Sequence, residues 1–191
     1  MKFIFTLIAS IAFTAGGAVT NFVPLALEGQ TFSHDPSTIM KDGANYFSFG
    51  TGPGIRTKSS PDLIHWTNRP AVFNRPPAWS KNVAPGFDGF IWAPEVVRVN
   101  GRFFLYYSVS AFGKQTSAIG LVTNATLDFT ATNFLWHDAG IVIRSTNGDA
   151  FNTIDPGAFL DADGKFVAAE SSVALVARPM AEVCLPNALT E

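Results

Sequence analysis

Two aspartates in matching contexts are the first candidates for chemistry in this sequence. Asp35 stands in HDPSTIMKDGANY and Asp155 in NTIDPGAFLDADGK, each directly before a proline and a few residues ahead of an Asp-Gly pair. Two carboxylates across a groove can cleave a glycosidic bond, because one activates water while a protonated partner gives its proton to the leaving oxygen. An Asp before a proline is also common in turns. For each aspartate alone both interpretations stay open, and the match between the two favours a paired site.

Aromatic residues near these aspartates suit a neutral sugar. Trp92 opens the segment WAPEVVRVNGRFFLYYSVS, and Phe112 lies in SAFGKQTSAIG. Flat apolar rings can cover the C–H faces of a sugar, while neighbouring Asn, Ser and Thr side chains bind its hydroxyls. Aromatic residues of β-proteins usually fill the core, so Trp92 by itself is equally compatible with packing. Neighbours on a strand point to opposite faces, so His34, beside Asp35, is assigned to packing in preference to substrate contact.

The elements that must position these residues form a repeat. Three segments, which begin at His34, Trp92 and Ile154, each run from a proline through a short apolar strand and an Asp-Gly or Asn-Gly pair into a second strand. Those dipeptides accept the positive φ that tight hairpin turns need. The three prolines are 58 and 62 residues apart. Such a period with several short strands is typical of a four-stranded propeller blade, and a β-sandwich of unrelated hairpins is the alternative.

The sequence therefore predicts an all-β fold, because no sustained i, i+3, i+4, i+7 apolar pattern indicates a long helix in the mature chain. In a propeller the strand that begins at each proline is innermost, and its first residues line the central channel. Asp35 and Asp155, two units apart, are then expected to face each other across that channel. The sequence contains no His/Cys spacing for zinc, no phosphate-binding glycine loop and no G-x-S-x-G elbow.

Composition and the first residues limit the partners and the location. The formal net charge is -2, and no Lys/Arg cluster supports binding to nucleic acid or to an anionic membrane. Residues 1–18 are predicted to be a secretory signal peptide, because their apolar run is shorter than the about 20 residues of a membrane-spanning helix. The protein is therefore expected to be secreted. Its one cysteine, Cys184, cannot form an internal disulfide, and Asn124-Ala125-Thr126 is a short glycosylation sequon that chance can also produce.

Several motifs, taken together, resemble a known family. The segment 31–165 is similar to the five-bladed β-propeller hydrolases of glycoside hydrolase family 43, and within that family to the endo-1,5-α-L-arabinanases. The motifs that carry the resemblance are HDPS at 34–37, SSPDLIHW at 59–66, IWAPEV at 91–96, SVSAFGKQTSAIGL at 108–121 and FNTIDPGAF at 151–159.

The resemblance implies an inverting hydrolase that cleaves internal α-1,5-arabinofuranosyl links of plant cell-wall arabinan, expected as a monomer. Asp35 matches the general base, and Asp155 matches the aspartate that orients the general acid and tunes its pKa. The acid itself is a glutamate of a fourth blade. Calcium is implied by resemblance alone, through a ligand from a later blade, and no cofactor is expected to be required. The positions that match substrate contacts are Trp92, Phe112, Gly113 and Asn152.

The sequence matches only part of the family's pattern. We expect a signal peptide at 1–18, a partial propeller domain at 19–165 with about the first three blades, and a divergent tail at 166–191 that follows a C-terminal truncation. The carboxylates of the tail match no acid motif: Glu170, Glu182 and Glu191. Without the acid, the chain is expected to be an impaired enzyme. A non-catalytic sugar-binding propeller fragment is one alternative, and a xylosidase or exo-acting arabinofuranosidase is another.

Overall fold

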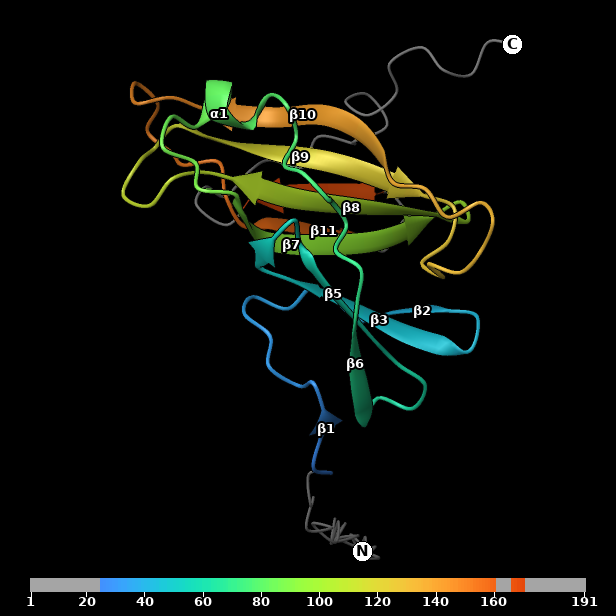
Figure 1. Cartoon of the computed structure of the whole chain (residues 1–191). Coiled ribbons are helices and arrows are strands. Elements are labelled where there is room, and N and C mark those ends of the chain that lie inside the picture. Colours follow the sequence, from blue (N-terminus) through green and yellow to red (C-terminus); the bar gives the residue numbers. More distant parts are fainter. Residues whose placement is uncertain (1–24, 161–165, 171–191) are drawn as a thin grey trace, which may run out of the picture.

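Strands account for nearly all the regular structure of the computed structural model, which describes residues 25–160 and 166–170 (Figure 1). These residues form twelve β-strands and one helix of four residues, α1 (Ser80–Val83). The all-β prediction is confirmed. Within the same residues, no helix has the length and apolar character needed to cross a membrane. The predicted signal peptide and residues 171–191 of the predicted tail lie outside the described residues.

The first repeat unit forms a five-stranded sheet in the order β1-β6-β5-β3-β2. Four of its strands follow one another as an antiparallel meander, and β1 joins β6 in parallel. The predicted Asp42-Gly43 turn connects β2 to β3, with Gly43 at a φ of +58°. The strands are β1 (Glu28–Gly29), β2 (Met40–Asp42), β3 (Asn45–Gly50), β5 (Arg56–Ser60) and β6 (His65–Arg69).

The second unit forms a sheet in the order β10-β9-β8-β7-β4, again as an antiparallel meander from β7 to β10. The predicted Asn100-Gly101 turn joins β7 to β8, and the short β4 pairs with the start of β7. The strands are β4 (Gly52–Pro53), β7 (Phe90–Val99), β8 (Arg102–Val109), β9 (Ser117–Asn124) and β10 (His137–Ser145).

The third unit is described as one antiparallel pair, β11 (Pro156–Leu160) with β12 (Phe166–Glu170). Its predicted Asp163-Gly164 turn falls in 161–165, outside the described residues. The predicted four-stranded antiparallel unit is thus confirmed for the first two repeats. The number of blades in the whole protein stays a prediction.

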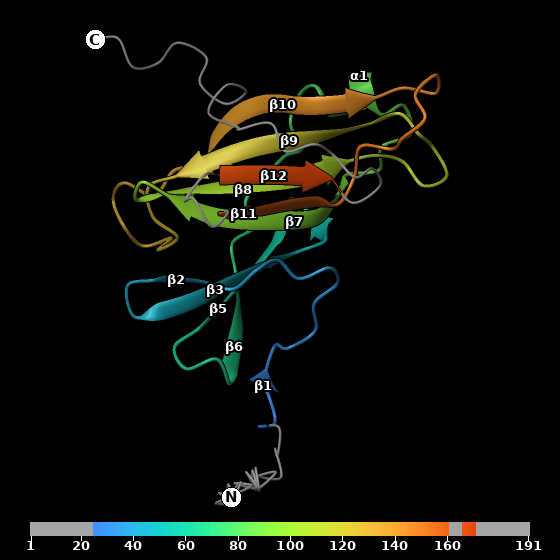
Figure 2. The ribbon, with the colours of Figure 1, turned by 180° about the vertical axis from the view of Figure 1, so that it is seen from behind.

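Both faces of the second sheet are buried, which argues against a two-layer sandwich. Tyr106 on one face of β8 packs in a core that includes Ala158 of β11, and Figure 2 shows β11 and β12 lying over this face. In a sandwich each sheet keeps an outer face in water, so stacking of successive units accounts for this burial better. The other face packs on the first sheet through buried side chains of β3 and β8: Phe47, Phe49, Phe103, Leu105 and Tyr107.

A polar contact also ties the first hairpin to the β9–β10 connection. The Asp42 carboxylate accepts hydrogen bonds from the Thr126 hydroxyl at 2.6 Å and from the Leu127 amide at 2.7 Å. Thr126 is the third residue of the glycosylation sequon. Its first residue, Asn124, is fully buried, and the Asn124 Oδ1 accepts from the amides of Thr126 and Leu135, both at 3.3 Å. The sequon side chains therefore hold this connection together.

We predict that the folded protein secreted from a eukaryotic host carries no glycan on Asn124. The side chain is 0% exposed, so an attached sugar would require the connection to open. Intact mass before and after treatment with an N-glycosidase checks this. A glycan on Asn124 in protein that unfolds at the same temperature as the bacterially produced chain would contradict the prediction.

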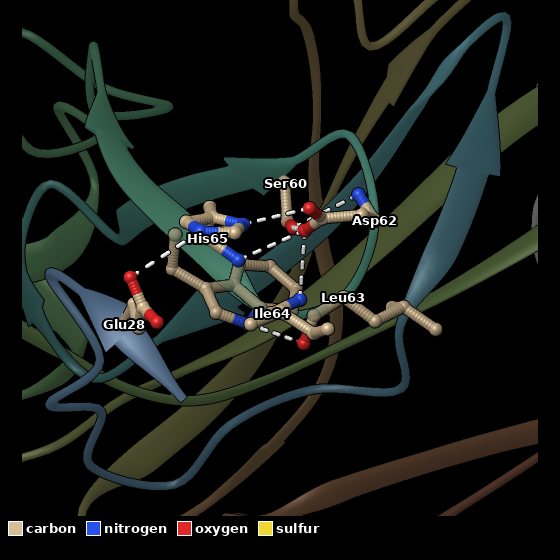
Figure 3. Close-up of polar contacts among 7 residues, drawn as sticks. Glu28, Ser60, Asp62, Leu63, Ile64 and His65 are labelled. Carbon is tan, nitrogen blue, oxygen red and sulfur yellow. Dashed lines mark hydrogen bonds and ion pairs between the residues drawn. The ribbon is translucent and has the colours of Figure 1, made fainter. Parts of the chain in front are cut away.

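The SSPDLIHW segment folds into a turn between β5 and β6 that is stabilised by its own side chains (Figure 3). Asp62 Oδ1 accepts from the amides of Ile64 and His65 at 2.9 and 2.8 Å, and Asp62 Oδ2 lies 2.7 Å from His65 Nδ1. The other ring nitrogen of His65 lies 3.3 Å from the Glu28 carboxylate in β1. Hydrogen bonds lower the pKa of Asp62, and the one from the His65 amide has the largest effect. The Asp62 carboxylate in turn raises the pKa of His65. The motif therefore attaches β1 to the edge of the first sheet.

We predict that His65→Gln lowers the unfolding temperature more at pH 5.5 than at pH 8.5. Because the folded-state pKa of His65 is raised, its contribution to stability is fully present below the ordinary value of about 6.5 and is lost as the pH rises through the raised pKa. The lowered pKa of Asp62 keeps that carboxylate ionised at both pH values. The His65–Asp62 pair is exposed, so we expect His65→Gln to unfold about 1–3 °C below the unmodified chain at pH 5.5.

Differential scanning fluorimetry of both proteins measures this difference. The other histidines are the same in both proteins, so the change in the unfolding-temperature difference between pH 5.5 and pH 8.5 reports His65. High salt should reduce it, since exposed charges are screened. If His65→Gln lowers the unfolding temperature equally at both pH values, the His65 ring acts only by packing.

Candidate active site

The residue before each repeat proline has a positive φ: +45° at Asp35, +39° at Ala93 and +54° at Asp155. Such values are uncommon for residues other than glycine, and a residue before proline is normally extended. Conformations of this kind gather at functional sites, where the surrounding structure holds them. The repeated sequence around Asp35 and Asp155 therefore corresponds to a repeated turn with an unusual backbone conformation.

The segment that carries Asp35 runs beside the end of β3. The Thr51 amide donates to the His34 carbonyl at 2.9 Å, and the Ser37 amide donates to the Phe49 carbonyl at 2.8 Å. A glycine at position 50 permits this approach, because a Cβ there would lie 3.0 Å from the His34 carbonyl oxygen. The prediction that a strand begins at Pro36 is wrong for this unit, since β2 begins at Met40. In the later units the proline lies within β7 or begins β11.

The Asp35 carboxylate is partly exposed and has two neighbours. The Thr51 hydroxyl donates to Asp35 Oδ2 at 2.7 Å. His34 Nε2 lies 3.5 Å from Asp35 Oδ1, and the two side chains are 67% and 43% exposed. The preferred assignment of His34 to packing is therefore wrong, and its alternative, substrate contact, stays a prediction. The alternation of faces holds only along a strand, whereas these two residues lie in a bend before β2.

Two further hydrogen bonds bring the turns of all three units together around the start of β7. The Ala93 amide donates to the Thr51 hydroxyl at 2.8 Å, and the Asp155 amide donates to the Ser108 hydroxyl at 2.9 Å. Ser108 is also the cross-strand partner of Trp92. The contacts thus run without interruption from Asp35 through the Trp92–Ala93 segment to Asp155.

The aromatic candidates differ in exposure. Trp92 is half-buried, whereas Phe112 is 97% exposed at the tip of the β8–β9 connection. A turn closed by the Lys114 amide and the Ala111 carbonyl, at 3.0 Å, presents it, and Gly113 there has a φ of +70°. A ring this exposed does not fill the core. In Figure 1 this connection, the β10–β11 connection and α1 lie at the same end of the second sheet.

Asn152 contributes to the β10–β11 connection that leads to Asp155. The buried Ser117 hydroxyl donates to the Asn152 carboxamide oxygen. Nearby, the Thr153 amide donates to the Ser145 hydroxyl at 2.9 Å, and that hydroxyl donates to the Gln115 carbonyl at 2.8 Å. The predicted sugar contact of Asn152 stays a prediction. Its carboxamide also fixes the connection that ends in the third turn.

Sequence reasoning passed over Thr51 and Ser108, although a signal was present. Both carry a hydroxyl near the end of the second strand of a unit, 15 and 14 residues after the repeat proline. A hydroxyl at this place of the repeat could have been singled out with the prolines. Its role could not be inferred, because the partner amide belongs to the next unit.

Among the described residues, no group of three or more His, Cys, Asp or Glu side chains could hold a metal ion. The calcium that the resemblance implies, through a ligand from a later blade, stays a prediction. A cavity of about 930 Å³ is lined in part by Pro53 and Phe90, and none of the candidate residues lines it. These two residues pair across β4 and β7, close in sequence to Thr51 and Trp92.

Comparison with known proteins gives a consistent result. Residues 29–172 match Glycosyl hydrolases family 43. The chain is 45% identical over 133 residues to the extracellular exo-α-(1→5)-L-arabinofuranosidase ArbA of Cellvibrio japonicus and 40% identical over 135 residues to the extracellular endo-α-(1→5)-L-arabinanase 1 of Bacillus subtilis. Each match covers 69% of this chain, and the chain spans 38% and 40% of the respective relatives.

A solved structure shows the same likeness. The α-L-arabinanase of Cellvibrio cellulosa in complex with arabinohexaose matches with a TM-score of 0.69 and 44% sequence identity. The match covers 71% of this chain and 43% of that one.

Proposed function

Because the chain belongs to glycosyl hydrolases family 43, we propose that it forms the part of an arabinan-cleaving glycoside hydrolase that supplies the water-activating base. The observation that carries this proposal is the set of contacts that links Asp35 and Asp155 through the start of β7. The names of the relatives, which act on α-1,5-linked arabinofuranosides, support the substrate class. The proposal places the substrate over the exposed Phe112 and the half-buried Trp92.

The surroundings of Asp35 support the proposed base role. The Thr51 hydroxyl donates to Oδ2, and in this proposal Oδ1, which has His34 Nε2 3.5 Å away, takes a proton from the attacking water. That water attacks the anomeric carbon on the face opposite the leaving oxygen, whose bond breaks as the configuration inverts. The leaving oxygen must then receive a proton from an acid. Asp155 orients that acid, which the resemblance assigns to a glutamate of a later blade.

We predict that the 191-residue chain, assayed as it stands, releases reducing ends from linear arabinan far more slowly than a five-bladed relative. General acid catalysis contributes about 10² to 10⁴ in rate, and we expect a deficit of this size. Asp35→Asn should abolish the remaining turnover, because an amide cannot accept the proton.

Asp128→Asn is the matched control. It removes the same charge from an exposed aspartate that only caps the β9–β10 connection through Thr130. A rate equal to that of a five-bladed relative would refute the need for an external acid. Equal loss of turnover in both variants would refute the base role of Asp35.

We predict that Phe112→Ala weakens binding of arabinohexaose by about 3- to 10-fold, the change expected from loss of one aromatic contact. Its ring is 97% exposed, so the substitution should leave the unfolding temperature unchanged. Isothermal titration calorimetry measures the affinity. Phe32→Ala, at another exposed phenylalanine (73%), is the control and should bind like the unmodified chain.

The exposure of Phe112 also favours a second candidate function, a sugar-binding module without catalysis. This candidate is favoured over the enzyme if the chain binds arabinohexaose, Trp92→Ala abolishes that binding, and no reducing sugar is released. Both functions would use Trp92 and Phe112 to bind sugar, and they differ only in whether Asp35 acts as a base.

The proposal has three further parts. Secretion is supported by the extracellular names of the relatives. An endo mode of cleavage rests on the resemblance of the SAFGKQTSAIGL segment, and the size distribution of arabinan products tests it against the exo mode. The fold proposed for the whole protein is a five-bladed propeller, to which the described residues contribute units one to three.

A further inference from the structure

The three pre-proline turns need something to hold them. Positive φ at Asp35, Ala93 and Asp155 is disfavoured in isolation and persists only where the surroundings over-determine it. At the second and third turns the contact is the same: the backbone amide of the turn donates to a side-chain hydroxyl of the preceding unit. The hydroxyls are those of Thr51 and Ser108, and both residues are buried, at 8% and 0% exposure.

The direction of the hydrogen bonds at Thr51 is fixed by chemistry. A hydroxyl has one proton and can accept through its lone pairs. The Ala93 amide can only donate, so the Thr51 oxygen must accept there. Its single proton is then directed to Asp35 Oδ2, 2.7 Å away. Donation to an ionised carboxylate is the stronger kind of hydrogen bond, and bonds in series polarise one another.

The contact at Thr51 therefore couples two functional elements. One hydroxyl fixes the rotation of the Asp35 carboxylate and also fixes the peptide that joins Trp92 to Ala93. Ser108 does the equivalent for the third turn, because it accepts from the Asp155 amide and pairs with Trp92 across β7 and β8. The backbone at Trp92 is thus next to one hydroxyl contact, at Ala93, and paired in register with the residue that makes the other.

We propose that Thr51 and Ser108 are positioning residues, whose hydroxyls set the two carboxylate-bearing turns of Asp35 and Asp155 against Trp92. This inference rests on the proposed function, since it assigns these turns to substrate. It predicts that removing either hydroxyl loosens the turn that it contacts, an effect that removing another buried hydroxyl does not have.

Two other buried hydroxyls provide matched controls. Thr57 and Ser110 are 9% and 1% exposed, and in the described part of the chain neither hydroxyl has a hydrogen-bond partner. Thr57→Val and Ser110→Ala therefore remove the same atoms as Thr51→Val and Ser108→Ala without removing a contact to a turn. Thr51→Ser keeps the hydroxyl and serves as the conservative rescue.

The first measurement is amide hydrogen exchange by NMR in the 191-residue chain, and it does not depend on any activity. Exchange of the Ala93 amide should accelerate at least tenfold in Thr51→Val, because its acceptor is lost, and remain slow in Thr51→Ser and Thr57→Val. The Asp155 amide should respond in the same way to Ser108→Ala and not to Ser110→Ala. Unfolding temperatures confirm that each variant is folded.

The second measurement is the affinity of the same proteins for arabinohexaose. We expect Thr51→Val to bind about tenfold more weakly, and Thr51→Ser to bind nearly as well as the unmodified chain. The positioning role is overturned if Thr51→Val binds like the unmodified chain, or if Thr57→Val loses as much affinity as Thr51→Val. If the unmodified chain neither binds nor cleaves arabinohexaose while the exchange pattern is as expected, the proposed function fails and the hydroxyl contacts are purely structural.

Discussion

From Phe103 to Tyr107, β8 carries only aromatic or aliphatic side chains, buried or half-buried on both faces, so this strand is stable only between two other layers. Phe103, Leu105 and Tyr107 pack toward the first sheet, and Tyr106 packs toward β11. Burial of each such side chain contributes about 1.5–3 kcal/mol. The units of the repeat must therefore stack, and the contacts between the sheets involve β2, β3, β7, β8 and β11. Everything at the candidate site follows from this stacking.

Because the units stack, the polar contacts that shape the site form between units. The Thr51 hydroxyl of the first unit holds the turn at Ala93, and the Ser108 hydroxyl of the second holds the turn at Asp155. The Asp42 carboxylate joins the first hairpin to the β9–β10 connection in the same manner. Each unit therefore gains part of its conformation from the one before it. A single unit could contain an Asp-Pro sequence but could not hold its backbone in this conformation.

The chemistry that the site supports depends on a balance between order and exposure. Asp35 is 43% exposed, which lets water reach it, while one of its oxygens is fixed by Thr51. Phe112 is far more exposed, on a turn whose shape is set by a local hydrogen bond between Lys114 and Ala111. A base needs an oriented carboxylate beside water, and a sugar-binding ring needs an open face. The two requirements are met by different means, one between units and the other within a single connection.

The all-β class, the hairpin turns at Asp42-Gly43 and Asn100-Gly101, and the pairing of Asp35 with Asp155 as candidates could all be predicted from the amino-acid sequence. These features are readable because hairpin turns and strand periodicity depend on neighbours a few residues apart. Three features became visible only in the folded chain: His34 lies beside Asp35 in a bend, Asn124 is buried, and Thr51 and Ser108 support the turns. The hydrogen bonds from the Ala93 and Asp155 amides span 42 and 47 residues, and that from Thr126 to Asp42 spans 84. Contacts over such separations exist only once the units have stacked, because the burial of β8 brings their inner strands together.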